Sequence, residues 1–416
     1  MAPMRFTDPE TYFPDFFVSQ EARMIQNTVH EFVNKEIMPI RHVLDDDTDY
    51  ELTDKIRQGM CDIGLQKLSF PKKYGGEGYT SAVCDCLISE ELARGDLGIA
   101  VYYACNRWGW RPALTANNEA VLNKFMPGFC ADEVKICAYN MTEPGGSHGG
   151  GGADIENPHF EATKIRTKAE LKGNEWVING SKIWATNSGD CDLQCVVCTV
   201  DPNLGLEGVV LIYVPYPWEG VSRGPDEKKC GCNTDRNCPT YFDNVTVPKE
   251  WGIGPGGIAA SIFETQTLGL GTCAMAAGVI RGAFEIVLGY SEHRIVGDKP
   301  LRQHSTTAVV LADMAIALET TRMLYLTTAY LRDHMDTLSP SAKAFYPTRA
   351  NITKVFGPEM AVKVIGDAMP LLGSYGYARD YNFEKYWRDS KILTLWLGGV
   401  LINRFNVCRG YYDLDL

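Results

Sequence analysis

The stretch Met141–Gly145, which reads Met-Thr-Glu-Pro-Gly, and the stretch Asn179–Asn187, which reads Asn-Gly-Ser-Lys-Ile-Trp-Ala-Thr-Asn, decide the fold predicted for this chain. A Thr-Glu-Pro-Gly turn that leaves a strand presents backbone N–H groups and the Thr142 hydroxyl on a tight loop. The second stretch predicts a hairpin turn that feeds a strand, whose alternation puts Trp184 and Thr186 on one face. A flat indole beside hydroxyl groups can stack on a planar ring and hydrogen-bond to its polar edge.

The residues around these two stretches divide the chain into three zones. Apolar residues recur with helical periodicity from about Ser19 to Cys137, and again from Gly254 onward. Between them, from Ala138 to about Val247, short alternating segments are separated by Gly, Asn and Pro turns. This order predicts an α+β protein with an N-terminal helical domain (residues 1–137), a central β-domain (138–250) and a C-terminal helical domain (251–416).

Together and in this order, the two stretches resemble the flavin-binding β-domain of the acyl-CoA dehydrogenase family. Three further segments are similar to family elements, namely the helix from Ala276 to Arg294, Leu-Gly-Ser-Tyr-Gly-Tyr at Leu372–Tyr377, and Glu-Lys-Tyr-Trp-Arg-Asp at Glu384–Asp389. The resemblance implies the acyl-CoA dehydrogenase fold, with a β-barrel-like central domain and a C-terminal four-helix bundle. It also implies FAD as the cofactor.

The resemblance assigns cofactor contacts residue by residue. Within one subunit, it implies that the flavin is held by Met141, Thr142, Ser147, Trp184 and Thr186. It implies that Arg294 and the Gly373-Ser374 turn serve the cofactor of a neighbouring subunit, so we expect a homodimer or a homotetramer.

The loop Gly145–Gly152 carries more glycines than the family usually has at this place. Glycine permits close backbone approach to a ligand and also adds flexibility. Two interpretations stay open, a plain surface insertion and a modified contact to flavin or coenzyme A, with Ser147 as the best match to the family's serine.

The family's usual catalytic base is missing from this sequence. Family enzymes desaturate an acyl thioester, and a glutamate takes the α-proton while the flavin accepts the β-hydrogen as hydride. Leu397 stands where most members carry that glutamate, and Leu268 stands where a smaller group carries it. Leucine accepts no proton, so we expect both side chains to form apolar walls of the acyl pocket.

Three residues are candidates for the missing chemistry. Glu264 lies one helical turn, about 5.4 Å, before Leu268 and is our candidate for a relocated base, the alternative being an ordinary helix carboxylate. Tyr103 lies near the expected acyl pocket, although an ordinary tyrosine pKa makes it a poor base. Arg107 is a candidate for recognising a substrate carboxylate, the alternative being a structural arginine.

These expectations favour an oxidoreductase that desaturates an unusual, cyclic or bulky acyl-CoA and passes electrons to an electron-transfer flavoprotein-type acceptor. Two alternatives stay open because both base positions are empty. One is another flavin reaction on the same fold, such as monooxygenation or removal of a leaving group. The other is a scaffold that binds flavin or coenzyme A without turnover.

Composition limits the partners and the compartment. The chain has 416 residues, a net charge of −12 and no basic block, which argues against nucleic acid or an anionic membrane surface as partner. The segment Met1–Tyr12 lacks the apolar region of a signal peptide, and no uninterrupted apolar run is long enough to span a bilayer. We therefore expect a cytoplasmic protein.

Fourteen cysteines are scattered along the chain, and the tightest group is Cys230, Cys232 and Cys238. This group lacks paired Cys-x-x-Cys halves and a nearby histidine, which are typical of metal sites. We expect reduced thiols and no metal.

Overall fold

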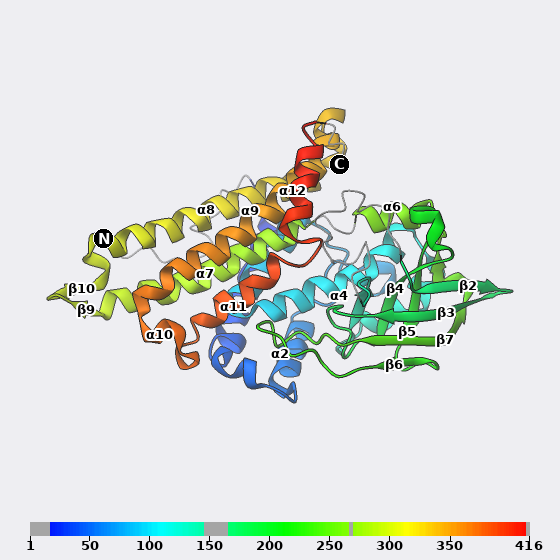
Figure 1. Cartoon of the computed structure of the whole chain (residues 1–416), viewed down its shortest axis with the longest axis horizontal. Coiled ribbons are helices and arrows are strands. Elements are labelled where there is room, and N and C mark those ends of the chain that lie inside the picture. The colour runs from blue at the N-terminus through cyan, green and yellow to red at the C-terminus, as the bar shows by residue number, and fades with distance from the viewer. Residues whose placement is uncertain (1–16, 145–164, 266–268, 413–416) are drawn as a thin grey trace.

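The computed structural model describes residues 17–144, 165–265 and 269–412. Helices form one part of the molecule and a twisted β-sheet forms the other, at opposite ends of its long axis (Figure 1). Helix α4 runs from the helical part toward the sheet, so it links the two (Figure 1).

The N-terminal segment is helical, as its periodicity predicts. Side-chain caps mark four helix starts, because Ser19, Ser81, Asp96 and Asn118 each accept a hydrogen bond from the backbone N–H three residues ahead. The helices are α1 (Gln20–Phe32), α2 (Glu51–Asp62), α3 (Ala82–Gly95), α4 (Leu97–Thr115) and α5 (Glu119–Phe129), with a π-helical turn at Val33–Ile37 and 3₁₀ turns at Arg41–Asp46 and Lys72–Tyr74.

The middle of the chain forms an eight-stranded sheet with the order β6-β7-β3-β2-β4-β5-β8, and β1 pairs with β4 in parallel. Strands β4 and β5 carry continuous apolar runs because they are buried along almost their whole length. The strands are β1 (Cys137–Asn140), β2 (Lys168–Lys172), β3 (Glu175–Lys182), β4 (Leu193–Thr199), β5 (Val209–Pro215), β6 (Val221–Arg223), β7 (Thr240–Pro248) and β8 (Gly252–Ile253).

The C-terminal segment returns to helices, and the longest of them lie side by side (Figure 1). A small hairpin of β9 (Ile295–Val296) and β10 (Lys299–Pro300) follows the first long helix. The helices are α6 (Ile258–Thr265), α7 (Leu270–His293), α8 (Ser305–Asp333), α9 (Pro340–Leu372), α10 (Ser374–Tyr377), α11 (Glu384–Leu393) and α12 (Gly399–Arg409).

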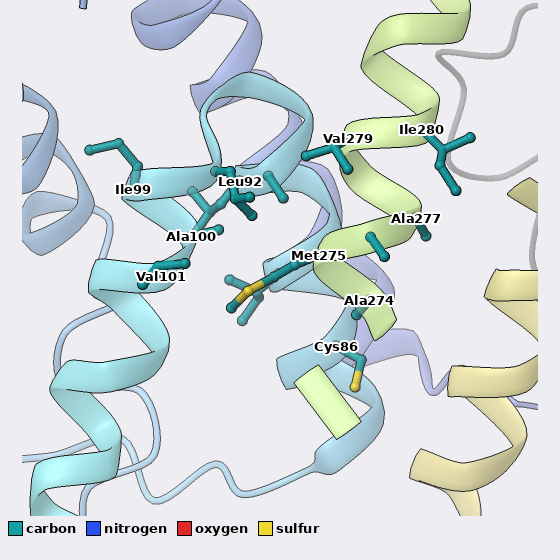
Figure 2. Packing of buried hydrophobic residues seen from close by; sticks show 14 of the residues in the cluster. Cys86, Leu92, Ile99, Ala100, Val101, Ala274, Met275, Ala277, Val279 and Ile280 are labelled. Atoms are coloured by element: carbon teal, nitrogen blue, oxygen red, sulfur yellow. The ribbon is translucent and has the colours of Figure 1, made fainter. Parts of the chain in front are cut away.

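Helix α7 is the centre of the helical core and packs against α3, α8 and α9. Figure 2 shows Met275 pointing from α7 toward α4, which carries Ala100 and Val101. A Cβ at Gly278 would lie only 2.3 Å from the carbonyl oxygen of Glu90, so glycine is required where α7 crosses α3. Val101 also lines the cavity described below, which ties this core to the site.

By length and composition alone, α7 could cross a membrane, with a mean hydropathy of 1.4 over its most apolar window. However, 83% of that window is buried inside the protein. A core helix that is apolar all round shows the same pattern.

The structure corrects the predicted shape of the Asn179–Asn187 stretch. Asn179 and Gly180 do not form a hairpin turn, because they lie inside β3 at an irregularity in its pairing with β7. The strand ends at Lys182, so Trp184 is not part of an alternating strand. Trp184 instead has a positive φ of 63°, which breaks the extended backbone.

Candidate functional site

A cavity of about 520 Å³ lies where α4, the ends of β1 and β3, and the loop between α11 and α12 meet. It has a wall of aromatic and aliphatic side chains, together with a few hydroxyl, amide and charged groups. The residues that line it include Val101, Cys105, Trp108, Met141, Thr142, Trp184, Thr186, Lys228, Lys229, Cys230, Asp235, Lys391, Trp396 and Leu397.

The Met141–Thr142 turn is fixed from behind by a buried ion pair. The Lys182 ammonium lies 2.7 Å from Glu143 Oε1 and also donates to the Met141 carbonyl at 3.0 Å. The Thr142 carbonyl accepts the N–H of Ile183. Burial alone would raise the pKa of Glu143, but Lys182 and the hydrogen bonds from Thr167 outweigh it and lower that pKa. Both carbonyls are therefore engaged away from the cavity, and Thr142 remains on its wall.

Trp184 and Thr186 reach the cavity from the bend after β3. The bend is held by Asn187, whose amide donates to the carbonyls of Tyr102 and Cys137, and by Asn237, whose amide donates to the Trp184 carbonyl at 3.1 Å. Half of the Trp184 surface is exposed, so an indole face is available at the cavity. The bend brings Trp184 and Thr186 to the same cavity, as the predicted strand alternation was expected to do, but by a different backbone path.

Another part of the cavity wall is the loop between α11 and α12, which carries Leu397. Leu397, Gly398 and Gly399 have successive positive φ values of 54°, 78° and 65°. A leucine in this left-handed region costs about 1–2 kcal/mol. The Asn403 amide holds the loop by donating to the carbonyls of Leu397 and Gly399 at 3.0 and 2.6 Å.

A buried lysine anchors this side of the cavity to the rest of the molecule. The Lys385 ammonium lies 2.8 Å from Asp45 and 2.9 Å from both Asp96 and Asp389. Asp389 in turn accepts the N–H of Cys232 at 2.7 Å. Burial would lower the pKa of Lys385, but the three carboxylates raise it, so the charge is held. The network joins α11 to α4 and to the segment 230–238.

One cavity residue, Asp235, was missed by the sequence analysis. Among the described lining residues it is the only carboxylate, and its side chain is almost fully buried. Its Oδ2 accepts the Thr186 hydroxyl, and its Oδ1 accepts the Asn187 N–H, each at 3.2 Å. Its place in the cysteine-rich stretch 230–238 is the one signal for it in the sequence.

Family models match the chain domain by domain. The model of the acyl-CoA dehydrogenase N-terminal domain matches residues 19–133, that of the middle domain matches residues 138–245, and that of the C-terminal domain matches residues 265–411. The chain belongs to the acyl-CoA dehydrogenase family. It is accordingly an oxidoreductase of the acyl-CoA dehydrogenase type, and its α+β fold is the fold of this family.

Individual relatives match almost the full length. A probable acyl-CoA dehydrogenase of Mycobacterium leprae is 28% identical, with 95% of this chain and 97% of the relative covered. A cyclohexane-1-carbonyl-CoA dehydrogenase of Syntrophus aciditrophicus is 27% identical over the same shares. A chain in the solved structure of the electron transferring flavoprotein of Acidaminococcus fermentans has a TM-score of 0.85 and 27% identity, with 96% of this chain and 100% of that chain covered.

The cavity of this acyl-CoA dehydrogenase family member fits an aromatic, hydrogen-bonding ligand such as a flavin. Trp184 offers a ring face, while Thr142 and Thr186 offer hydroxyl groups on the same wall. The buried indole N–H of Trp396 has no hydrogen-bond acceptor among the described residues, so a bound acceptor would satisfy it. These features agree with the FAD that the family resemblance implies.

Two expected substrate residues lie elsewhere. The Arg107 guanidinium makes a bidentate ion pair with Asp85 at 2.5 and 2.6 Å, and it also donates to the Tyr103 hydroxyl at 3.2 Å and to Ser69. Neither Arg107 nor Tyr103 lines the cavity. The structural alternative therefore accounts for Arg107, since its fork is already occupied by a carboxylate.

Three further residues that were expected to contact a cofactor lie at the far end of the helical part from the sheet. Arg294 follows α7 directly, and the Gly373-Ser374 turn joins α9 to α10. The rings of Tyr290 and Tyr375 pack edge to face at 6.2 Å, which brings these two segments together. Figure 1 shows α10 and the β9–β10 hairpin at the opposite end from the strands.

The remaining candidates fall on or beside the undescribed parts of the chain. Glu264 belongs to the last turn of α6, but its side chain lies outside the described structure. Ser147 and Leu268 also lie outside the described residues. Of the thiols, Cys230 is exposed at the cavity, and no group of three or more metal-ligating side chains is found within the described ranges.

Proposed function

We propose that the protein is an FAD-dependent dehydrogenase that desaturates a cyclic or otherwise bulky acyl-CoA. The observation that carries this proposal is that Trp184, which offers an aromatic face, and Leu397, which offers an aliphatic side chain, line one cavity. Relatives named cyclohexane-1-carbonyl-CoA dehydrogenase, from Syntrophus aciditrophicus and Geobacter metallireducens, support a cyclic acyl group.

FAD would supply the redox chemistry, since a flavin accepts a hydride from a carbon atom of the substrate. The chain's own residues would bind and orient it. Trp184 would stack on the ring, and the hydroxyl groups of Thr142 and Thr186 would hydrogen-bond its polar edge. The nearby carbonyls of Met141 and Trp184 already accept hydrogen bonds within the protein. The rigid backing of Glu143 and Lys182 keeps this wall in place, which favours a precise ring position.

An apolar wall at Leu397 suits a ring substituent. Leu395, Trp396 and Leu397 line the cavity together, and Trp396 packs near Trp108 with ring centroids 6.3 Å apart. Burying a cyclic hydrocarbon against these side chains would stabilise binding by about 25 cal/mol per Å² of apolar area removed from water. The same contacts would exclude water from the reacting carbons.

Glu264 is the base that we propose. It belongs to the last turn of α6, and its carboxylate would meet an acyl group turned in its pocket. Asp235 is a poor alternative, because both of its carboxylate oxygens already accept hydrogen bonds and Lys229 lies 3.6 Å away.

An electron-transfer flavoprotein is the acceptor that we propose, a choice supported by the resemblance to the Acidaminococcus fermentans structure. A second copy of the chain is also part of the proposal. Arg294 and the Gly373-Ser374 turn lie at the opposite end from the sheet, so their cofactor contacts would serve a neighbour. Exposed Val309, Ile316 and Met323 recur every seven residues along α8 and offer an apolar stripe for such a neighbour.

Product analysis tests this function. The protein is incubated under argon with cyclohexane-1-carbonyl-CoA and an artificial electron acceptor. The expected product is the unsaturated thioester, which has lost two hydrogen atoms. Oxygen-dependent formation of a product that contains an atom from O₂ would instead indicate monooxygenation. A product that has lost a substituent would indicate elimination, and binding without any product would indicate a scaffold.

A further inference from the structure

Asp235 is a buried carboxylate at the cavity wall that the proposed reaction leaves without a role. Its two oxygens have different partners, since Oδ2 accepts the Thr186 hydroxyl and Oδ1 accepts the Asn187 N–H. The segment that carries it is fixed to the core, because the neighbouring Thr234 hydroxyl donates to Asp96 at 2.6 Å. The carboxylate is therefore held in a defined orientation against Thr186.

A threonine hydroxyl has one proton and two lone pairs. Thr186 donates its proton to Asp235 Oδ2, and both side chains lie on the cavity wall. Toward a ligand, the Thr186 oxygen then presents lone pairs alone. It can accept a hydrogen bond from a ligand N–H, and it cannot donate one to a ligand acceptor.

The surrounding groups favour this arrangement. The Lys229 ammonium lies 3.6 Å from Asp235 Oδ2, an ion pair in which the carboxylate acts only as a hydrogen-bond acceptor. The Cys105 thiol is also hydrogen-bonded to Thr186, and burial, followed by the charge of Asp235, raises the pKa of the thiol despite that bond. The thiol is thus protonated and does not compete with Asp235 as a strong acceptor for the Thr186 proton.

We propose that Asp235 is a positioning residue that fixes Thr186 as a hydrogen-bond acceptor toward the ring edge of the bound cofactor. This inference rests on the proposed binding of FAD in the cavity. An oxidised flavin offers one acceptor nitrogen at its central ring, whereas in the two-electron reduced flavin that nitrogen carries a hydrogen. An acceptor-only Thr186 therefore favours the reduced form, and Asp235 raises the reduction potential through the hydroxyl that it orients.

Asp235→Asn separates this effect from simple loss of contact. The Asn187 N–H still requires an acceptor, so the amide oxygen of the new side chain should stay in the Oδ1 place and its NH₂ should face Thr186. The NH₂ donates to the Thr186 oxygen, and the Thr186 proton is then redirected toward the cavity. The substitution also removes a negative charge, which shifts the potential by itself.

A double-mutant cycle cancels the charge effect. The midpoint potential of bound FAD is measured by anaerobic spectroelectrochemistry in the full-length holoprotein and in the variants Asp235→Asn, Thr186→Val and the double variant. Thr186→Val removes the hydroxyl and keeps the shape of the side chain. Asp235→Asn changes the potential in both backgrounds. The change should be more negative in the wild-type background than in the Thr186→Val background, by at least about 30 mV. For a two-electron couple, this difference corresponds to a tenfold change in the equilibrium constant.

Thr186→Ser is the conservative control, because it keeps a hydroxyl and should keep the full difference. Equal shifts in the wild-type and Thr186→Val backgrounds, or a larger downward shift in the Thr186→Val background, would overturn the role of Asp235 while leaving FAD binding intact. Failure of the unmodified chain to bind FAD would contradict the proposed function, and this inference with it. Thermal unfolding of each variant verifies that the comparison is made on folded proteins.

Discussion

Trp184 and Leu397 line the same cavity from different segments of the chain, and both have a left-handed backbone, with φ values of 63° and 54°. Each conformation costs about 1–2 kcal/mol for a residue with a Cβ. In each case an asparagine amide holds the carbonyl of the strained residue, Asn237 for Trp184 at 3.1 Å and Asn403 for Leu397 at 3.0 Å. Backbone strain that is held in this way is typical of functional sites.

The aromatic wall should retain the cofactor. The purified protein is expected to be yellow, with about one FAD per chain, and Trp184→Ala should weaken FAD affinity at least about tenfold because it removes the stacking face. Fluorescence titration of the apoprotein with FAD measures this. Tyr241→Ala, which removes an exposed aromatic ring on β7 away from the cavity, should leave the affinity unchanged. A colourless protein that gains no flavin absorbance on incubation with FAD would refute the expectation.

Leu397 should determine acyl preference and take no part in proton transfer. Leu397→Ala is expected to shift the ratio of kcat/KM for cyclic over short linear acyl-CoA esters several-fold, since it removes apolar wall, and to leave the pH profile unchanged. Leu401→Ala, on exposed α12 surface, is the matched control. A changed pH profile with an unchanged acyl preference would show that Leu397 has been placed wrongly.

The proposed base is tested by a substitution that preserves shape. Glu264→Gln keeps hydrogen-bonding reach and cannot take a proton, so flavin reduction should slow by several orders of magnitude while ester affinity stays within a few-fold. Stopped-flow absorbance measures the first quantity, and equilibrium titration measures the second. Glu175→Gln, on exposed β3 surface, should leave both unchanged. Near-normal reduction by Glu264→Gln would eliminate Glu264 as the base.

Lys354 makes stability depend on pH. Its ammonium is buried beneath the Leu397 loop, where it donates to the Leu393 carbonyl at 2.6 Å, and burial lowers its pKa from the ordinary 10.5 to about 7. Between these two values the unfolded chain holds a proton that the folded chain lacks, so the free energy of unfolding should rise with pH. The slope contributed by Lys354 is at most about 1.4 kcal/mol per pH unit.

Urea unfolding between pH 7 and pH 9 measures this contribution as the difference from Lys354→Met, in which the rise should be absent. Lys363→Met provides the control, because Lys363 lies exposed on the same helix and pairs with Asp367 at the surface. A wild-type profile parallel to that of Lys354→Met would contradict the lowered pKa.

Periodicity and local motifs predicted much of the fold. The repeating apolar residues of α1 and α3 fit their buried faces, and the Thr-Glu-Pro turn follows β1 as expected. Asn179-Gly180 looked like a hairpin turn because that pair favours one. Pairing of β3 with β7 continues past it, and this long-range pairing overrides the local preference.

The parts of the site that the sequence could not reveal depend on distant partners. The bend at Trp184 is held by Asn237, more than fifty residues away, and the Arg107 fork is filled by Asp85 on a neighbouring helix. Asp235 is brought to Thr186 by the Lys385 network and not by any local motif. Such contacts leave no periodic trace along the chain.

Anaerobic mixing of the FAD-loaded protein with cyclohexane-1-carbonyl-CoA tests the central claim most directly. If the cavity between Trp184 and Leu397 desaturates a cyclic acyl-CoA, the visible absorbance of the oxidised flavin should bleach without oxygen, because the flavin takes up the hydride. About one equivalent of ester should suffice, and bleaching should be faster than with butyryl-CoA. A protein that binds FAD and the ester tightly, yet shows no bleaching with either thioester, would contradict the account.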